Sequence, residues 1–190
     1  SSDVCSSDLP ERYLVDLFIS EIKELISFME KMFNKKLDYD EFYKRWQWAN
    51  KTIDTQLEIQ QLRRHVPAPM SSADYFATIF PGMTMLGTKE ALDFYRQMLT
   101  EVRERSEKNI AVVPEEKFRI MWSGIPVWFN LGLLNYPEQY GGVMSIETNY
   151  QALPRERSED PYVDLAYRYF AKNFSIGVAS QVDLAKKFAQ

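Results

Sequence analysis

Cysteine and histidine are almost absent from this sequence. Its 190 residues include one cysteine, Cys5, and one histidine, His65. Metal centres built on thiolates need several cysteines, so this chain cannot complete one by itself. His65 follows Arg63 and Arg64 at the predicted end of a helix, where positive side chains interact favourably with the helix dipole. We interpret it as a helix-end residue, because no serine, cysteine or carboxylate forms an evident catalytic pair with it.

Long apolar runs and a large charge excess are also missing. No stretch reaches the roughly 18 apolar residues that a transmembrane helix needs. The 23 basic and 27 acidic residues are interspersed, without the basic patch that nucleic-acid binding requires. A chain of 190 residues, 45% of them hydrophobic, can bury a substantial core. We therefore expect a soluble, cytoplasmic protein with neither a membrane nor a nucleic acid as partner.

The first nine residues, SSDVCSSDL, differ in origin from the rest of the chain in our interpretation. They can be back-translated, residue for residue, into a common sequencing-adapter oligonucleotide. We expect Ser1 to Leu9 to be an artefact that the natural gene lacks, and such segments are excluded from fold reasoning. Without Asp3 and Asp8, the chain has 23 basic and 25 acidic residues.

Residues 10–113 show the pattern of a helical region. Apolar residues recur at spacings of three and four over 11–33, which predicts a long amphipathic helix. Asp38 and Glu41 form a capping box, which predicts a second helix that continues until the prolines at 67 and 69. Further helices are predicted over 71–80, ended by Pro81 and Gly82, and over 88–108.

The segment RIMWSGIPVWFNLGLLNYPEQYGGVMSIETNY, at 119–150, predicts a strand, a turn, a helix and a second strand. Apolar and polar residues alternate over 118–123, and Pro126 suits the first turn of a helix. We expect this helix to continue through Tyr136 and to end at Gly141 and Gly142. The second strand follows over 143–146 and ends at Glu147.

This order of elements predicts an α/β fold. A mostly helical N-terminal part is followed by half of a Rossmann-like or flavodoxin-like domain with a parallel sheet. The expected divisions are 1–9 as artefact, 10–113 as helical region and 114–190 as a truncated α/β domain. Asp160 and Pro161 predict the start of a further helix that ends near Phe174, and another helix is predicted from Val182.

Candidate site residues lie where the two predicted strands end, since ligands of open parallel sheets bind beyond the carboxyl ends of strands. Glu147 is the predicted catalytic residue, and Gly124 offers a tight turn at the other strand end. The neighbouring residues that we predict to bind substrate, together with Gly124, are Pro126, Trp128, Asn130 and Tyr150.

Other polar clusters carry less functional information. Asp38, Asp40 and Glu41 resemble metal ligands, but helix capping explains them, so no metal site is predicted. Arg155 and Arg157 could contact a phosphate group, and we favour a solvated loop for both of them.

The 119–150 segment resembles the 2-hydroxyacyl-CoA dehydratase family, which also contains the related subunits of benzoyl-CoA reductase. The resemblance rests on the RIMWSGIP turn, the NLGLLNYPEQYGGV and ETNY stretches, and the later DPYVDLAYRYFAKNF segment. The helical region that begins at YLVDLFISEIKELISFMEKM fits the order of elements in the family. The match covers most of the chain.

The resemblance implies a radical dehydration of 2-hydroxyacyl-CoA to enoyl-CoA in an oxygen-sensitive enzyme. Two related subunits form the heterodimer, 4Fe-4S clusters are held by cysteine thiolates, and an ATP-dependent activator supplies the electron. Some relatives carry a cysteine after the acid that matches Glu147, whereas Thr148 follows it here. We therefore expect an internal fragment whose cluster ligands lie outside it and which is inactive alone.

Three functions remain open from the sequence. The first is a dehydratase subunit, a lyase, and the second is a benzoyl-CoA reductase subunit on the same scaffold. The third is a noncatalytic α/β binding or assembly module, because a strand-turn-helix pattern alone is compatible with many functions.

Overall fold

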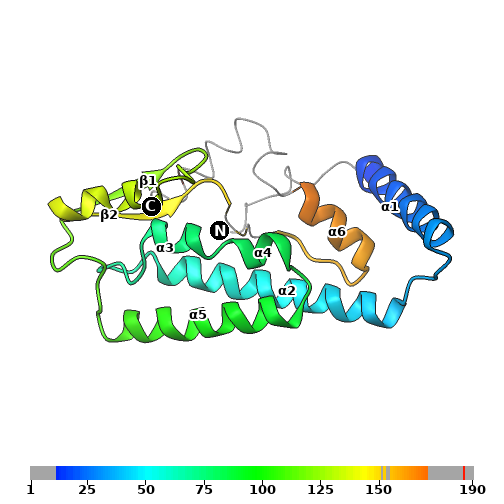
Figure 1. Ribbon diagram of the computed structural model, residues 1–190, viewed down its shortest axis with the longest axis horizontal. Coiled ribbons are helices and arrows are strands. Elements are labelled where there is room, and N and C mark those ends of the chain that lie inside the picture. The colour runs from blue at the N-terminus through cyan, green and yellow to red at the C-terminus, as the bar shows by residue number, and fades with distance from the viewer. Residues whose placement is uncertain (1–11, 151, 153–154, 171–185, 187–190) are drawn as a thin grey trace. The chain divides into compact units, whose positions relative to one another are not determined.

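The computed structural model describes residues 12–150, 152, 155–170 and 186. By its internal contacts the chain forms two compact units (Figure 1). Of the described residues, the first unit combines 12–44 with 155–170, and the second combines 45–150 with 152 and 186. The expected division between 113 and 114 falls inside the second unit and stays a prediction about domain organisation. The nine residues interpreted as adapter lie outside the described residues.

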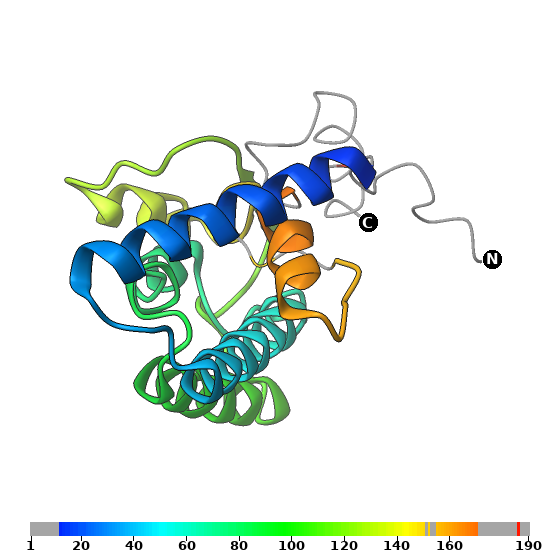
Figure 2. The same ribbon diagram turned by 90° about the vertical axis from the view of Figure 1, so that its right-hand side faces the viewer.

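The first unit pairs two helices from distant parts of the chain. α1 (Arg12–Phe33) packs on α6 (Pro161–Phe170), and Figure 2 shows the two helices side by side. The Phe18 ring lies 5.0 Å from that of Tyr169. α6 begins as predicted, since Asp160 Oδ1 accepts hydrogen bonds from the Tyr162 and Val163 backbone N–H groups. Its predicted end near 174 and, apart from residue 186, the helix predicted from 182 lie outside the described residues.

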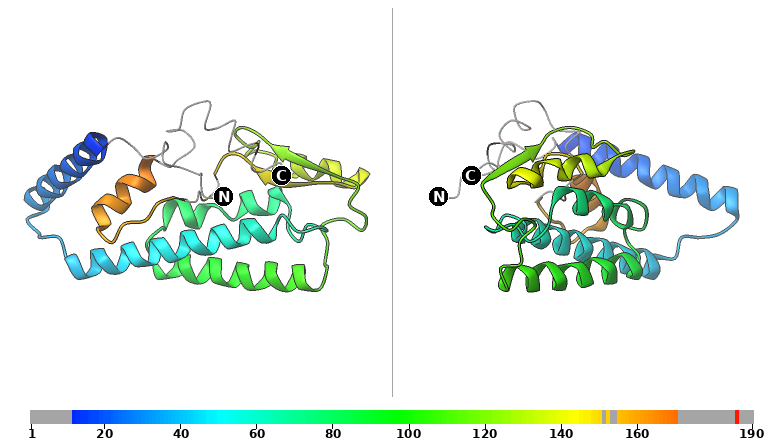
Figure 3. Two further views of the ribbon diagram at one scale, coloured as in Figure 1. Left: turned by 180° about the vertical axis from the view of Figure 1, so that it is seen from behind. Right: turned by 60° about the vertical axis from the view of Figure 1, so that its left-hand side comes forward.

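Helices α2 to α5 supply most of the core of the second unit. α2 (Tyr39–Leu62) begins in the first unit, and its later part runs beside α5 (Lys89–Glu107) in Figures 1 and 3. The short helices are α3 (Ser72–Ala77) and α4 (Phe80–Thr84). The main core cluster contains Ile59, Met70, Ala73, Tyr75, Phe76, Ile79, Tyr95, Met98, Leu99, Val102, Leu134 and Met144.

Helix ends follow their capping residues closely. The predicted helix over 88–108 is confirmed, with Thr88 as N-cap and Lys108 as C-cap. Asp38 Oδ1 accepts a hydrogen bond from the Glu41 backbone N–H at 3.0 Å, as the capping box predicts. The expectation that Pro81 ends a helix is wrong, because Pro81 lies near the start of α4, where its missing N–H costs nothing.

The sheet consists of two parallel strands in the described part of the chain. β1 (Phe118–Trp122) pairs with β2 (Gly142–Glu147), which confirms the predicted parallel pair. The register runs from Phe118 opposite Gly142 to Trp122 opposite Glu147 and is interrupted by a bulge between Ile120 and Met121. The α/β class, with a small Rossmann-like sheet beside a mostly helical remainder, is therefore confirmed.

The connection between the strands differs from the prediction of one helix from Pro126. Residues 123–130 are irregular, and a 3-10 helix, η1 (Leu131–Tyr140), follows. Pro137 lies inside η1, and a proline there lacks the N–H of an α-helical hydrogen bond and crowds the carbonyl four residues earlier. Gly141 ends η1 as predicted, with a left-handed φ of 82°.

None of the described helices is both long and apolar enough to cross a bilayer.

Candidate functional site

The carboxyl ends of β1 and β2 meet, as the sequence predicts. The Thr148 backbone N–H donates to the Trp122 carbonyl at 3.0 Å, one residue beyond the end of β2. The Thr148 hydroxyl lies 3.4 Å from the Ser123 hydroxyl. Two hydroxyl groups therefore stand together at the sheet end, next to Gly124.

Glu147 lies at the centre of a buried hydrogen-bond network. Its side chain has an exposed fraction of 0%, and that of Arg63 is 1% exposed. Arg63 donates from Nη1 to Oε1 at 2.5 Å and from Nη2 to Oε2 at 2.8 Å, which is a two-pronged ion pair. The Ser72 hydroxyl donates to Oε2 at 2.6 Å. Both carboxylate oxygens are thus already bound by protein groups.

Arg63 keeps its positive charge although it is buried. Burial by itself lowers the pKa of Arg63, and the charge and hydrogen bonds of Glu147 outweigh this, so the pKa is raised overall. The Arg63 guanidinium also lies 4.3 Å from the centre of the Tyr75 ring. Burial, followed by the negative charge of Glu147, raises the pKa of Tyr75. The Tyr75 hydroxyl therefore stays neutral, and it lies 3.5 Å from the Tyr150 carbonyl.

Aromatic rings form a second feature of this sheet end. The Trp128 and Tyr150 rings lie 5.5 Å apart between centroids, so the structure brings these two predicted residues together. Trp128 also contacts Phe76 and Phe80, at 5.9 and 5.6 Å. Trp128 remains 38% exposed and Phe129 beside it is 94% exposed. The loop after β1 thus presents large apolar side chains to solvent.

The other predicted residues share this loop. Gly124 has a φ of +109°, and a Cβ built there would meet no atom within 4 Å. Its backbone angle therefore explains the glycine, and crowding by the described chain does not. Pro126 is buried, and Asn130 is exposed at the N-cap position of η1. Gly124, Pro126 and Asn130 thus lie along the segment that joins β1 to η1, while Trp128 and Tyr150 pack together.

Sequence reasoning missed the partners of Glu147. The sequence indicates only that Arg63 is a positive residue at a helix end, and it does follow α2 directly. Ser72 lies in the first turn of α3. Neither residue lies near Glu147 in the sequence, so no local pattern could have paired them. A wholly polar side chain at the end of an apolar strand was the available signal for a buried partner.

The first unit contains another buried ion pair, at Arg155, for which the sequence favours a solvated loop. That expectation is wrong, since the Arg155 side chain is 4% exposed. Its Nη1 and Nη2 donate to the two oxygens of Asp164, at 2.5 and 2.9 Å. Asp164 lies on α6 and is completely buried, so the loop is fixed to the helix by this ion pair.

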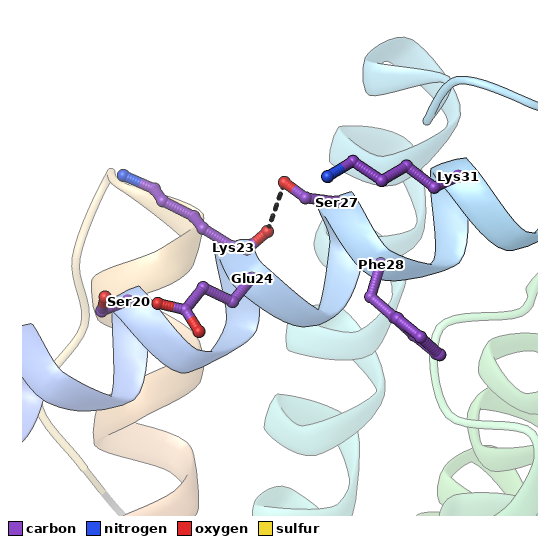
Figure 4. Close-up of a pocket in the computed structure, with 6 residues that line it drawn as sticks. All are labelled: Ser20, Lys23, Glu24, Ser27, Phe28 and Lys31. Carbon is purple, nitrogen blue, oxygen red and sulfur yellow. Dashed lines mark hydrogen bonds between the residues drawn. The ribbon is translucent and has the colours of Figure 1, made fainter.

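A hollow of about 390 Å³ lies along α1 and is lined by Ser20, Lys23, Glu24, Ser27, Phe28 and Lys31 (Figure 4). Figure 4 shows Lys23 and Lys31 extended along the helix surface, with the Ser27 hydroxyl bonded to the Lys23 carbonyl. A hollow formed by a single helix is open to solvent, and none of the predicted site residues lines it.

The described residues offer no metal centre. No group of three or more histidine, cysteine, aspartate or glutamate side chains is placed to hold a metal ion in the described ranges. Those ranges also contain no cysteine, because Cys5 lies outside them. They therefore do not fit an iron-sulfur cluster, which needs thiolate ligands.

Comparison with known proteins gives consistent matches. A sequence model of the family described as 2-hydroxyglutaryl-CoA dehydratase, D-component, matches residues 3–189. The chain is 30% identical over 125 residues to (R)-2-hydroxyglutaryl-CoA dehydratase, subunit alpha, of Acidaminococcus fermentans, covering 65% of this chain and 26% of that protein. It is 26% identical over 118 residues to the (R)-phenyllactyl-CoA dehydratase alpha subunit of Clostridium sporogenes, covering 62% of this chain and 28% of that protein.

These alignments span about a quarter of the length of each relative. The family match extends over nearly the whole chain, and both relatives are alpha subunits of dehydratases that act on acyl-CoA substrates. The chain therefore belongs to the 2-hydroxyglutaryl-CoA dehydratase D-component family.

Proposed function

We propose that this chain is part of an alpha-type subunit of a 2-hydroxyacyl-CoA dehydratase, which converts a 2-hydroxyacyl-CoA to the enoyl-CoA. The observation that carries the proposal is the family match over residues 3–189, supported by the two relatives named as dehydratase alpha subunits. In the overall reaction a hydroxyl leaves carbon 2 and a hydrogen leaves carbon 3. One water is released, and substrate and product are at the same oxidation level.

The proposed substrate-facing site is the carboxyl end of the two strands. The exposed ring of Trp128, packed on Tyr150, would form an apolar wall for the acyl chain. The paired hydroxyls of Ser123 and Thr148 could donate hydrogen bonds to a substrate oxygen. Gly124, Pro126 and Asn130 would shape the loop between them.

Glu147 stays in the proposed site, with a role that its geometry defines. Because both of its oxygens are bound by Arg63 and Ser72, we propose that it holds the end of β2 in place. It would act on the substrate through the position of Thr148 and Tyr150. The sequence-based prediction that Glu147 itself reacts stays a prediction. Substitution of Glu147 by glutamine tests both this role and the positioning role.

The cofactor and partners are proposed from the family resemblance. They are a 4Fe-4S cluster, a related second subunit and an ATP-dependent activator that supplies one electron to start the radical reaction. The names of the relatives, both alpha subunits, support a second subunit. Because the described residues do not fit a cluster, we assign its ligands to other parts of the enzyme and no step to the residues described above.

The test uses the full-length subunit, purified without oxygen together with its second subunit and activator. With ATP and a reductant, we expect (R)-2-hydroxyacyl-CoA to be converted to enoyl-CoA, followed by chromatography. Reduction of benzoyl-CoA without any dehydration would instead assign the chain to the reductase branch. An assembled complex that turns over neither substrate would favour a noncatalytic module.

A further inference from the structure

The sheet end carries four aromatic side chains in mutual contact, which we call the aromatic wall: Phe76, Phe80, Trp128 and Tyr150. The Trp128 ring is central, because it lies 5.5 to 5.9 Å from each of the other three rings. Phe76 belongs to α3, which lies beside β2 in Figure 1, and it is completely buried. Phe80 is 50% exposed and Trp128 is 38% exposed. The wall is therefore anchored in the core and also accessible from solvent.

Tyr150 is held in the aromatic wall by an uncommon backbone conformation. Its φ of +64° lies in the left-handed region, which bulky residues rarely occupy. From this position its ring meets Trp128 edge to face, with 78° between the two ring planes. Backbone strain of this kind persists only where the surrounding structure imposes it, and it occurs preferentially at ligand sites. We interpret the wall as a surface built for a ligand.

The segments that carry the aromatic wall contain no positive side chain. Residues 66–88, which include α3 and α4, and residues 120–150, which include β2, have no lysine, arginine or histidine. Their charged residues are the acids Asp74, Glu138 and Glu147. Arg63, which precedes the first segment, is 1% exposed and is bound to Glu147 through both terminal nitrogens. These segments therefore offer no counter-charge to a negative ligand group at the wall.

We propose that the aromatic wall selects a 2-hydroxyacyl-CoA whose acyl side chain is uncharged and carries an aromatic ring, against one whose side chain ends in a carboxylate. This inference rests on the proposed function, which supplies the acyl-CoA, and adds the class of its side chain. An aromatic ring can pack edge to face or offset on the exposed rings of Trp128 and Phe80. A carboxylate placed there loses its hydration without gaining a partner, which is costly.

The experiment compares two thioesters with different side chains, (R)-phenyllactyl-CoA and (R)-2-hydroxyglutaryl-CoA. The kcat/KM of each is measured with the full-length subunit, assembled with its second subunit and activator without oxygen. We expect the wild-type enzyme to prefer the phenyl thioester roughly tenfold or more. Trp128→Ala should lower kcat/KM for the phenyl thioester roughly tenfold and change that of the carboxylate thioester much less, whereas Trp128→Phe should keep the preference.

A second variant adds a charge to the wall. Phe80→Arg should raise kcat/KM for the carboxylate thioester relative to the phenyl thioester by roughly tenfold or more, because the cation supplies the missing partner. Phe94→Ala on α5 is the matched control, since Phe94 is also 38% exposed and also meets another ring, that of Tyr95, edge to face. It should leave the preference unchanged. If Trp128→Ala does not fold, Phe80→Ala replaces it, because Phe80 is half exposed.

The ratio of the two kcat/KM values separates selection from a structural role. A loss of folded enzyme lowers both values alike and leaves their ratio unchanged. An unchanged ratio in the folded wall variants overturns the proposal, and so does a wild-type enzyme that prefers the carboxylate thioester. If Trp128→Ala prevents assembly with the second subunit and the remaining complex keeps the wild-type ratio, the wall is a protein interface and the proposal is also overturned.

Failure of the proposed function would give a different result. The wild-type complex would then dehydrate neither thioester, and isothermal titration calorimetry with the same two compounds would test the wall. Tighter binding of the phenyl thioester that depends on Trp128 would support the selective site, and equal or absent binding would reject it. A complex that dehydrates both thioesters with a ratio independent of Trp128 would keep the dehydratase function and reject the selection.

Discussion

At the scale of single residues, the Arg63 and Glu147 pair connects two segments that are far apart in the sequence. A buried ion pair is weak evidence for net stability, because desolvation offsets much of the attraction between its charges. Removing one partner is a different matter, since the other charge is then left buried and uncompensated. The pair therefore holds the segment after α2 against the end of β2. Loss of one partner is expected to lower the free energy of unfolding strongly.

We predict that Arg63→Met destabilises the protein by about 3 to 5 kcal/mol, as in other broken buried pairs. The double variant with Glu147→Leu is expected to recover much of this loss, because no charge is left buried. Urea denaturation checks both. Arg103→Met is the control, since its pair with Glu58 is about half exposed, and a change of only about 0 to 1 kcal/mol is expected there. Equal effects at both sites would contradict this account.

The acid Glu138 gives a pH-dependent prediction. Burial, followed by the negative charge of Asp74, raises the pKa of Glu138 in the folded protein. The folded state thus holds this proton more tightly than the unfolded state. The contribution of protonated Glu138 to stability is complete below the pKa of the unfolded state, about 4.5. This contribution is lost as the pH rises through the higher pKa of the folded state.

Glu138→Gln should therefore remove part of the decrease in stability that accompanies rising pH in this window. Chemical denaturation at a series of pH values from acid to neutral measures it. Glu101→Gln on α5 removes an exposed carboxyl and serves as the control. An unchanged slope of stability against pH in Glu138→Gln would show that this carboxyl titrates alike in both states.

At the scale of elements, local rules predicted most of the fold. Periodicity and capping residues located α1, α5 and the start of α6, because each of these ends depends on side chains within a few positions. The loop after β1 was mispredicted, since Pro126 suits a helix but cannot impose one on the residues that follow. The two strand ends were correctly expected to meet, whereas the partners of Glu147 come from tertiary packing and leave no local trace.

Replacement by alanine should affect stability differently at Gly141 and at Gly132. Gly141 has a φ of +82°, and a Cβ there would lie 2.9 Å from the Glu115 carbonyl oxygen. We predict that Gly141→Ala costs about 1 to 2 kcal/mol from the backbone angle, with the contact adding to it. Gly132 lies inside η1, and a Cβ there has only the Asn130 side chain at 3.4 Å. Gly132→Ala should be neutral or slightly stabilising in thermal denaturation, and a larger loss there than at Gly141 would refute the argument.

At the scale of the whole molecule, the units do not follow the order of the chain. Residues 12–44 and 155–170 belong to one unit, and 45–150 with 152 to the other. Contacts such as that of Phe18 with Tyr169 join segments from opposite ends of the described chain. Periodicity identifies the helices that take part in such contacts and says nothing about which helices pair, so this grouping could not be predicted from the sequence.

The lack of thiolates leads to a prediction for the whole protein. We expect the 190-residue chain with Cys5→Ser to bind no stoichiometric iron-sulfur cluster, because it has no cysteine left. The full-length subunit is expected to bind one. Anaerobic reconstitution with iron and sulfide, followed by iron determination and electron paramagnetic resonance, compares the two. A stoichiometric cluster in the cysteine-free chain would show that other ligands suffice.

The bulge in the sheet determines the face to which Glu147 points. Side chains three positions apart on a regular strand point to opposite faces, so without the bulge Met144 and Glu147 would lie on opposite faces of the sheet. The register places Met144 opposite Ile120, Ile146 opposite Met121 and Glu147 opposite Trp122, which leaves Ser145 as the extra residue. Because Ser145 has no partner on β1, Met144 and Glu147 lie opposite Ile120 and Trp122, which are two positions apart. Glu147 therefore points to the same face of the sheet as Met144, which belongs to the core. Deleting Ser145 should therefore preserve the Arg63 pair, whereas deleting Val143 should turn the carboxylate to the opposite face.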